Sequence, residues 1–299
     1  MFEIKKEFNF IKHRKWYYIV SIIIIIVSIG GGMLQGYNYG IDFTGGTMMQ
    51  IDMKQEIPVS EIKKILDSND IEADIVHAGE NNREIILRTT QSLDSNMRNA
   101  LISDLNEKYG TTQDDVLAAE QFGPSVGDLL KKNAVKAVII AIICMLIYIA
   151  VRFEWKFGIA AVIALVHDIL ILVGFYGLFQ IPVNNPFIAS ILVILGYSIN
   201  DTIVVFDRIR ENLRIMKKSK LEELIDKSIN QTLVRSIATS ATTVLAILAL
   251  FIMGGDTIKQ FTLPLIIGIT SGTCSSIFIA SPIWYEINKA MDKPKYRGK

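Results

Sequence analysis

The acidic residue Asp201 lies inside an apolar run that extends from about Pro186 to Phe206. An ionised carboxylate at the centre of a bilayer costs roughly 2.5 to 3.5 kcal/mol on insertion scales, so such a residue normally faces the interior of a helix bundle. Arg235 stands at the start of another apolar run and carries a permanent positive charge. The two residues together indicate a site where an ion or proton neutralises the acid.

Polar side chains at helical spacing accompany both charged residues. They are Tyr197, Ser198 and Asn200 near Asp201, and Thr239 and Thr242 after Arg235. Residues three or four positions apart share one face of a helix, so each set is expected to form a polar stripe. Two facing stripes would line a wet ion pathway. The alternative is a static buried ion pair between Asp201 and Arg235.

His167 and Asp168 lie near the middle of a further apolar run. Adjacent residues on a helix point about 100° apart, and no second imidazole or carboxylate follows at the spacing that a metal site requires. We therefore expect no metal and no cofactor. Asp168 either bonds neighbouring helices and stabilises the bundle or takes part in ion transfer.

The composition is that of a membrane protein. Hydrophobic residues make up 51% of the 299 positions, and the mean hydropathy is +0.36. The apolar residues concentrate in six runs that reach or approach the length needed to cross a bilayer. These runs cover residues 16–35, 134–151, 157–178, 186–206, 236–254 and 261–284. The predicted fold class is an α-helical polytopic membrane protein with six transmembrane helices.

Basic residues lie before the first apolar run and after the last one, which places both termini in the cytoplasm by the positive-inside rule. The predicted division of the chain follows from this topology. It comprises a cytoplasmic N-terminus (1–15), a first transmembrane helix (16–36), an extracytoplasmic domain (37–131), transmembrane helices two to six (132–285) and a cytoplasmic tail (286–299).

The segment 37–131 differs in charge from the rest of the chain. It holds 17 acidic and 8 basic residues, a net charge of −9, whereas the whole chain has a net charge of +1. Its pattern of strand, helix, strand, strand, helix and strand predicts an α+β ferredoxin-like domain. An acidic surface argues against nucleic-acid binding, and no nucleotide-binding motif occurs.

Two short motifs connect this domain to the membrane. Gly45 and Gly46 permit a tight passage from the first helix into the first strand, and Gly123 with Pro124 ends the last strand. We interpret both motifs as parts of a domain hinge, with a rigid linker as the alternative for the second. A separate amphipathic segment, 219–230, is expected to lie along the cytoplasmic membrane surface.

Six motifs occur in order along the chain. They are GIDFTGGT after the first span, EQFGPSVG before the second, LVHDIL in the third, GYSINDTIVVFDRIREN at the end of the fourth, NQTLVRSIATSATT at the start of the fifth and SSIFIASPI in the sixth. Together they resemble the SecF family over nearly the whole chain. That family partners SecD in bacterial Sec protein export and belongs to the RND superfamily of ion-driven transporters.

The resemblance implies a non-enzymatic membrane subunit that uses the proton-motive force to assist export of unfolded proteins across the plasma membrane. Asp201 and Arg235 match the family's proton-pathway acid and arginine, and a second acid lies in SecD. The bundle would be half of an RND-type bundle. The implied partners are SecD, the SecYEG channel, a YajC-type accessory subunit, the translocating preprotein and the lipid bilayer.

Two other classes of function compete with this interpretation. An RND-type exporter of lipids or small molecules would use the same acid and arginine, but such exporters carry two halves and two large outer domains in one chain. An intramembrane hydrolase built on His167 and Asp168 lacks a second catalytic group on either helix. Proton and sodium coupling remain open alternatives.

Overall fold

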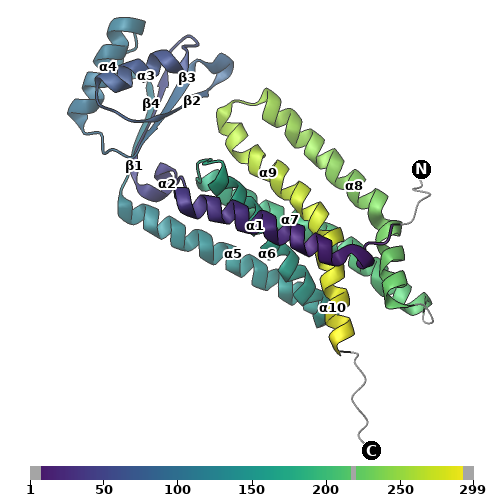
Figure 1. Ribbon diagram of the computed structural model, residues 1–299. Helices are drawn as coiled ribbons and strands as arrows, with labels where there is room; N and C mark the ends of the chain where they lie inside the picture. The colour runs from purple at the N-terminus through teal and green to yellow at the C-terminus, as the bar shows by residue number, and fades with distance from the viewer. Residues whose placement is uncertain (1–7, 217–219, 292–299) are drawn as a thin grey trace, which may run out of the picture.

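The computed structural model describes residues 8–216 and 220–291. Figure 1 shows an elongated bundle of helices with a smaller, sheet-containing domain at one end. Within the described ranges, six helical segments are long and apolar enough to cross a membrane. The α-helical membrane architecture expected from the apolar runs is therefore present.

The membrane helices are longer than the apolar runs that predict them. They are α1 (Arg14–Gln35), α5 (Pro124–Arg152), α6 (Trp155–Leu178), α7 (Asn185–Ile215) and α8 (Leu221–Met253). The sixth segment consists of α9 (Asp256–Ser275), a π-helical stretch (Ser276–Ala280) and α10 (Ser281–Met291), and a short 3₁₀ helix (Ile11–His13) precedes α1. The predicted cytoplasmic tail is described only as far as Met291.

Helices α6, α7 and the sixth segment form the centre of the bundle. The most apolar stretch of α6 buries 50% of its residues inside the protein, whereas that of α5 buries 6%. Figure 1 shows α5 along one edge of the bundle. The apolar surface of α5 is therefore free to contact lipid or another protein.

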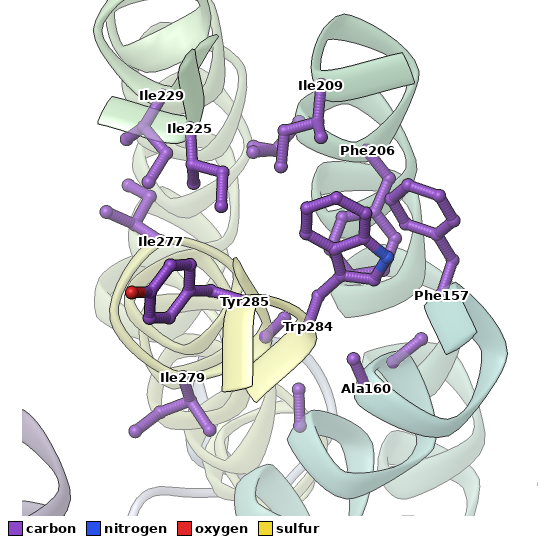
Figure 2. Packing of buried hydrophobic residues seen from close by; sticks show 14 of the residues in the cluster. Phe157, Ala160, Phe206, Ile209, Ile225, Ile229, Ile277, Ile279, Trp284 and Tyr285 are labelled. Carbon is purple, nitrogen blue, oxygen red and sulfur yellow. The ribbon is translucent and has the colours of Figure 1, made fainter. Parts of the chain in front are cut away.

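An aromatic cluster closes the bundle at the end opposite the domain (Figure 2). The ring of Phe157 stacks on Trp284 at a centroid distance of 4.6 Å and lies 4.9 Å from the ring of Phe206. Ile225 and Ile229 of α8 complete this core and are fully buried. These contacts join α6, α7, α8 and α10.

The amphipathic segment expected on the membrane surface is instead the first part of α8, which begins at Leu221. Its apolar residues Leu224, Ile225 and Ile229 are 2% exposed or less and pack in the same core as Ile11 and Tyr285. The expectation of a lipid-facing helix was wrong because the N-terminal 3₁₀ helix and α10 cover this apolar face. Position 219 lies outside the described residues.

The domain consists of a four-stranded antiparallel sheet and two main helices. Its elements are a short α2 (Ile41–Thr44), β1 (Gly46–Asp52), α3 (Val59–Ser68), β2 (Asp74–Ala78), β3 (Glu84–Thr89), α4 (Ser95–Tyr109) and β4 (Val116–Phe122), with 3₁₀ turns at Glu80–Asn82 and Gln113–Asp115. The strands pair in the order β2-β3-β1-β4. The strands and main helices occur in the order that the sequence pattern predicts.

The domain has a hydrophobic core of its own, separate from the bundle. Met49 and Ile51 of β1 lie opposite Leu87 and Ile85 of β3 in the sheet register. These four side chains are at most 3% exposed and pack with apolar residues of α3 and α4, including Ile62, Leu66, Leu101 and Leu105. The alternation along β1 directs this face of the sheet toward the helices.

Hydrogen bonds join the domain to the bundle beyond the two chain connections. Gln260 Oε1 of α9 accepts from Arg88 Nη1 of β3 at 2.8 Å and from Asn184 Nδ2 at 2.8 Å. Asp42 Oδ2 accepts from the backbone N–H of Asn185 at 2.8 Å. The start of α9 is therefore tied both to the domain and to the cap of α7.

Candidate functional site

Asp201 lies in α7 at the junction of three helices. Its side chain is 6% exposed, and Oδ2 accepts from Ser240 Oγ of α8 at 2.8 Å and from Thr273 Oγ1 of α9 at 3.1 Å. The two hydroxyls also contact each other at 2.6 Å. One carboxylate oxygen therefore holds α8 and α9 against α7.

The second carboxylate oxygen of Asp201, Oδ1, lacks a hydrogen-bond donor among the described residues, although the group is nearly enclosed. A carboxylate carries about four acceptor positions, so this oxygen keeps capacity for a proton or a cation. The arrangement allows Asp201 to change its charge while Oδ2 keeps its hydroxyl partners.

A stripe of hydroxyls on α8 leads to Asp201. It consists of Ser228, Thr232, Ser236 and Ser240, spaced four residues apart and each at most 8% exposed. Asn212 of α7 donates to Ser228 Oγ at 2.8 Å at one end, and Ser240 contacts Asp201 at the other. Ser236 Oγ is buried without a hydrogen-bond partner among the described residues. The buried hydroxyl stripe thus follows the α7–α8 interface.

The sequence contains this buried hydroxyl stripe as Ser or Thr at every fourth position, a spacing that places the four side chains on one face of α8 without showing that this face is buried. The sequence interpretation instead favoured Arg235, Thr239 and Thr242. Those three side chains are exposed, and no ion pair joins Arg235 to a described residue. Five residues of helix separate Arg235 from Ser240, which turns the arginine about 140° away. The structure does not bring Arg235 to Asp201.

The polar residues expected beside Asp201 also separate. Tyr197 is 43% exposed, and Asn200 is exposed as well. Ser198 is buried but donates to Asp168 Oδ2 at 2.6 Å rather than to Asp201. Ser198 lies about one turn before Asp201 in α7 but faces Asp168 of α6. Spacing along α7 therefore did not identify the partner of Ser198.

Asp168 is fully buried, and both of its oxygens have partners. Oδ2 accepts from Ser198 and from Ser275 Oγ at 2.8 Å, while Oδ1 accepts from Ser271 Oγ at 3.0 Å and lies 3.1 Å from His167 Nδ1. His167 and Asp168 are adjacent on the helix and start about 100° apart, yet the imidazole of His167 turns toward the carboxylate of Asp168. This full set of contacts is typical of an acid that stabilises helix packing.

The sixth segment contacts both acids. Ser271 and Ser275, four residues apart, face Asp168, and Thr273 between them faces Asp201. Gly272 lies so close to α7 that a Cβ there would be 2.8 Å from Ser198 Cβ. The hydroxyls of α9 were not predicted as site residues, because serine and threonine are common in helices and only packing decides which ones meet an acid.

Two sequence families match this chain. Residues 102–290 match the family described as Protein export membrane protein SecD/SecF, C-terminal, and residues 35–57 match the SecD/SecF GG Motif. The chain belongs to the SecD/SecF family. The resemblance to SecF seen in the sequence motifs is confirmed.

Relatives within the SecD/SecF family align over nearly the whole chain. A protein translocase subunit SecF from Sebaldella termitidis is 40% identical over 97% of this chain and 94% of its own length. The corresponding subunit from Haemophilus influenzae is 38% identical over 93% of this chain and 86% of its own length. These relatives favour the protein-export interpretation over a small-molecule exporter.

Solved structures of the SecD/SecF family show the same architecture. A crystal structure of SecDF from Thermus thermophilus, described as a translocon-associated membrane protein, matches 97% of this chain with a TM-score of 0.83 and 36% identity. A SecDF structure in the super-membrane-facing form matches with a TM-score of 0.73 and 35% identity, again over 97% of the chain. The chain spans 40% of the length of either SecDF chain.

The GG motif of the family includes the first pair of predicted hinge residues. Gly45 and Gly46 have φ angles of +82° and +145°, and a Cβ on Gly46 would lie 2.0 Å from the carbonyl oxygen of Thr89. Gly123 has an ordinary φ of −74°, and Pro124 begins α5. Glycine is therefore required sterically at position 46, whereas Gly123 is under no such constraint.

Proposed function

We propose that this chain is a SecF-type subunit of a bacterial protein translocase. It uses an ion gradient across the cytoplasmic membrane, together with SecD, to assist the export of unfolded proteins. The observation that carries the proposal is the carboxylate of Asp201, which is buried where three membrane helices meet. Among the described residues, its hydrogen-bond donors all bond Oδ2. The names of the curated relatives, protein translocase subunits, support the same role.

A SecD partner would cover the polar residues that this bundle leaves exposed. Tyr197, Asn200, Arg235, Thr239 and Thr242 are exposed on α7 and α8, where lipid would be an unfavourable neighbour for a guanidinium group. The Thermus thermophilus SecDF relative continues well beyond the matched region in one chain. We propose that Arg235 meets an acid of SecD, and that the complex docks on SecYEG with a YajC-type subunit and contacts the preprotein.

The membrane orientation is part of the proposal. Both termini lie in the cytoplasm of a bacterium, and the domain, assigned to residues 37–131, lies outside the cytoplasmic membrane. The domain is ferredoxin-like, which its antiparallel strand order β2-β3-β1-β4 supports. Gly45, Gly46, Gly123 and Pro124 form the hinge between domain and membrane.

Helix α9 connects the candidate ion site to the outer domain. Thr273 contacts Asp201, and Gln260 near the start of the same helix contacts Arg88 of the domain. Thirteen residues of helix span about 20 Å, so one continuous helix links the two contacts. When Asp201 becomes neutral, the hydrogen bonds that Oδ2 accepts from the two hydroxyls weaken without breaking, which allows α9 to shift relative to α7.

The available energy suits this mechanism. One unit charge that crosses 100 mV releases about 2.3 kcal/mol, which is enough to bias the position of a domain.

Asp168, with all its contacts made, keeps α6, α7 and α9 together while Asp201 titrates. The buried hydroxyl stripe on α8 would carry the ion from Asp201 to the cytoplasmic end of the bundle, the direction in which the gradient drives it.

The proposal is tested by replacing Asp201 with asparagine, which keeps the size of the side chain and removes its titration. We expect Asp201→Asn to abolish ion-coupled secretion of a reporter in cells depleted of the native protein. Asp207→Asn, on the exposed side of the same helix, is the matched control and should secrete normally. Normal secretion and ion flux in Asp201→Asn vesicles that contain SecD would refute the proposed role of Asp201.

A further inference from the structure

An apolar groove opens on the surface of the bundle near the domain end, between α5, α6 and α7. It has a volume of about 380 Å³ and is lined by aliphatic and aromatic residues of these three helices. Tyr37 and Tyr39, which follow α1, also line it. Val135 and Ile139 of α5 are 60% and 50% exposed beside it, so the groove opens away from the bundle interior.

Three lysines lie on or one turn before the stretch of α5, residues 134–139, that lines this groove. Lys131 Nζ lies 4.9 Å from the centre of the Tyr39 ring, which itself lines the groove. Lys132 and Lys136 are exposed and form no ion pair with any residue in 8–216 or 220–291. Asp128, one turn before Lys132, is exposed and pairs with neither lysine. Lys132 and Lys136 are therefore not neutralised by an ion pair within the part of the chain that the structure describes.

The lysines lie at the depth of the membrane segment rather than beyond it. Residues 134–139 of α5 share the groove with residues 169–176 of α6, so Lys136 lies level with the last turns of α6. A lysine at this depth extends its ammonium group toward the headgroup region. Such residues are normally depleted on the side of the membrane that we assign to the domain.

We propose that this groove is a binding site for an anionic phospholipid of the leaflet on the domain side. The acyl chain lies along the apolar walls between α5 and α7, and the headgroup phosphate accepts from Lys132 and Lys136. Tyr37 and Tyr39 lie at the level where tyrosines favour the membrane interface. The charge of the three lysines selects an anionic lipid over a zwitterionic one, and this binding is independent of the role of Asp201.

The test uses the full chain in phosphatidylcholine vesicles. A trace of phosphatidylglycerol or phosphatidylcholine with a photoactivatable group at the same acyl position is cross-linked, and the labelled peptides are mapped. We expect phosphatidylglycerol to label α5 and α7 at the groove several-fold more than phosphatidylcholine. Lys132→Gln/Lys136→Gln should lower this preference about fivefold for each lysine removed. Lys12→Gln/Lys15→Gln, near the other end of the bundle, is the matched control and should leave it unchanged.

Two further measurements separate charge from folding. Lys132→Arg/Lys136→Arg should retain the preference, and 1 M salt should reduce it in the parent protein, because the screening length falls to about 3 Å. Equal labelling by both lipids in the parent, or an unchanged preference in Lys132→Gln/Lys136→Gln, would overturn the proposal. Loss of groove labelling when SecD is reconstituted with the chain would overturn it as well, since a protein would then occupy the groove.

Discussion

At the scale of single residues, the two buried acids differ in how completely their oxygens are bonded. Asp168 has partners on both oxygens, whereas the donors to Asp201 among the described residues all bond Oδ2. A fully bonded acid is held in place, and a partly bonded acid can accept a proton without breaking every contact. Two carboxylates on neighbouring helices are thus suited to different roles.

The sequence predicts the two buried acids but not the difference in their hydrogen bonding. An acid within an apolar run is visible in the sequence, so both Asp168 and Asp201 could be selected. Their donors could not be assigned, because Ser198 and Thr273 meet an acid only through the packing of separate helices. The sequence favours Arg235 as a permanent positive charge at the start of the next apolar run, yet its place on the α8 surface depends on the rotation of that helix.

Asp168→Ala should destabilise the bundle. It would leave the hydroxyls of Ser198, Ser271 and Ser275 without their shared acceptor, at a cost of about 1 to 3 kcal/mol for each unsatisfied group. Unfolding of the purified protein in detergent measures the effect, with Asp168→Asn as a milder variant that keeps one acceptor oxygen. If Asp168→Asn blocked ion flux at unchanged stability, Asp168 would belong to the ion pathway instead.

At the scale of elements, the order of helices and strands follows from periodicity, but the ends of helices do not. The fifth apolar run predicts a helix from about residue 236, whereas α8 begins at Leu221 because its amphipathic start packs on Ile11 and Tyr285. Hydropathy marks where lipid is tolerated rather than where a helix ends. The added length carries the first part of the buried hydroxyl stripe.

The two ends of the domain should respond differently to the same small substitution. Gly46→Ala places a methyl group against the Thr89 carbonyl at a φ of +145°, so we expect a loss of several kcal/mol or failure of the domain to fold. Gly123→Ala has an ordinary φ and no atom nearer than 3.8 Å, and should change stability by less than about 1 kcal/mol. Protease resistance of the domain in membranes compares the two. Equal sensitivity would contradict the steric argument.

At the scale of the whole molecule, orientation can be measured directly. After Cys144 and Cys274 are replaced by alanine, single cysteines at Asn82 and Glu223 should report opposite sides of the membrane. An impermeant thiol reagent applied to intact cells should label Asn82→Cys and not Glu223→Cys, because the proposed topology places the basic ends of the chain in the cytoplasm. The reverse result would invert the proposed topology.

Removing the contact between α9 and the domain should uncouple secretion from ion flux. Gln260→Ala deletes the acceptor shared by Arg88 and Asn184, two hydrogen bonds worth about 0.5 to 1.5 kcal/mol each, and leaves Asp201 and its hydroxyl donors in place. We therefore expect reduced secretion of a reporter, with ion flux retained in vesicles that contain SecD.

Gln113→Ala provides the control for this uncoupling. Gln113 is an exposed glutamine of the domain in the 3₁₀ turn before β4, apart from the contact with α9, so its replacement should affect neither measurement. Arg88→Gln should reproduce part of the Gln260→Ala effect, because it removes the domain's side of the same contact. If secretion in Gln260→Ala equalled that of the control, α9 would not transmit the state of Asp201 through Gln260. The coupling would then have to pass through α2 and the GG motif, where Asp42 bonds the start of α7.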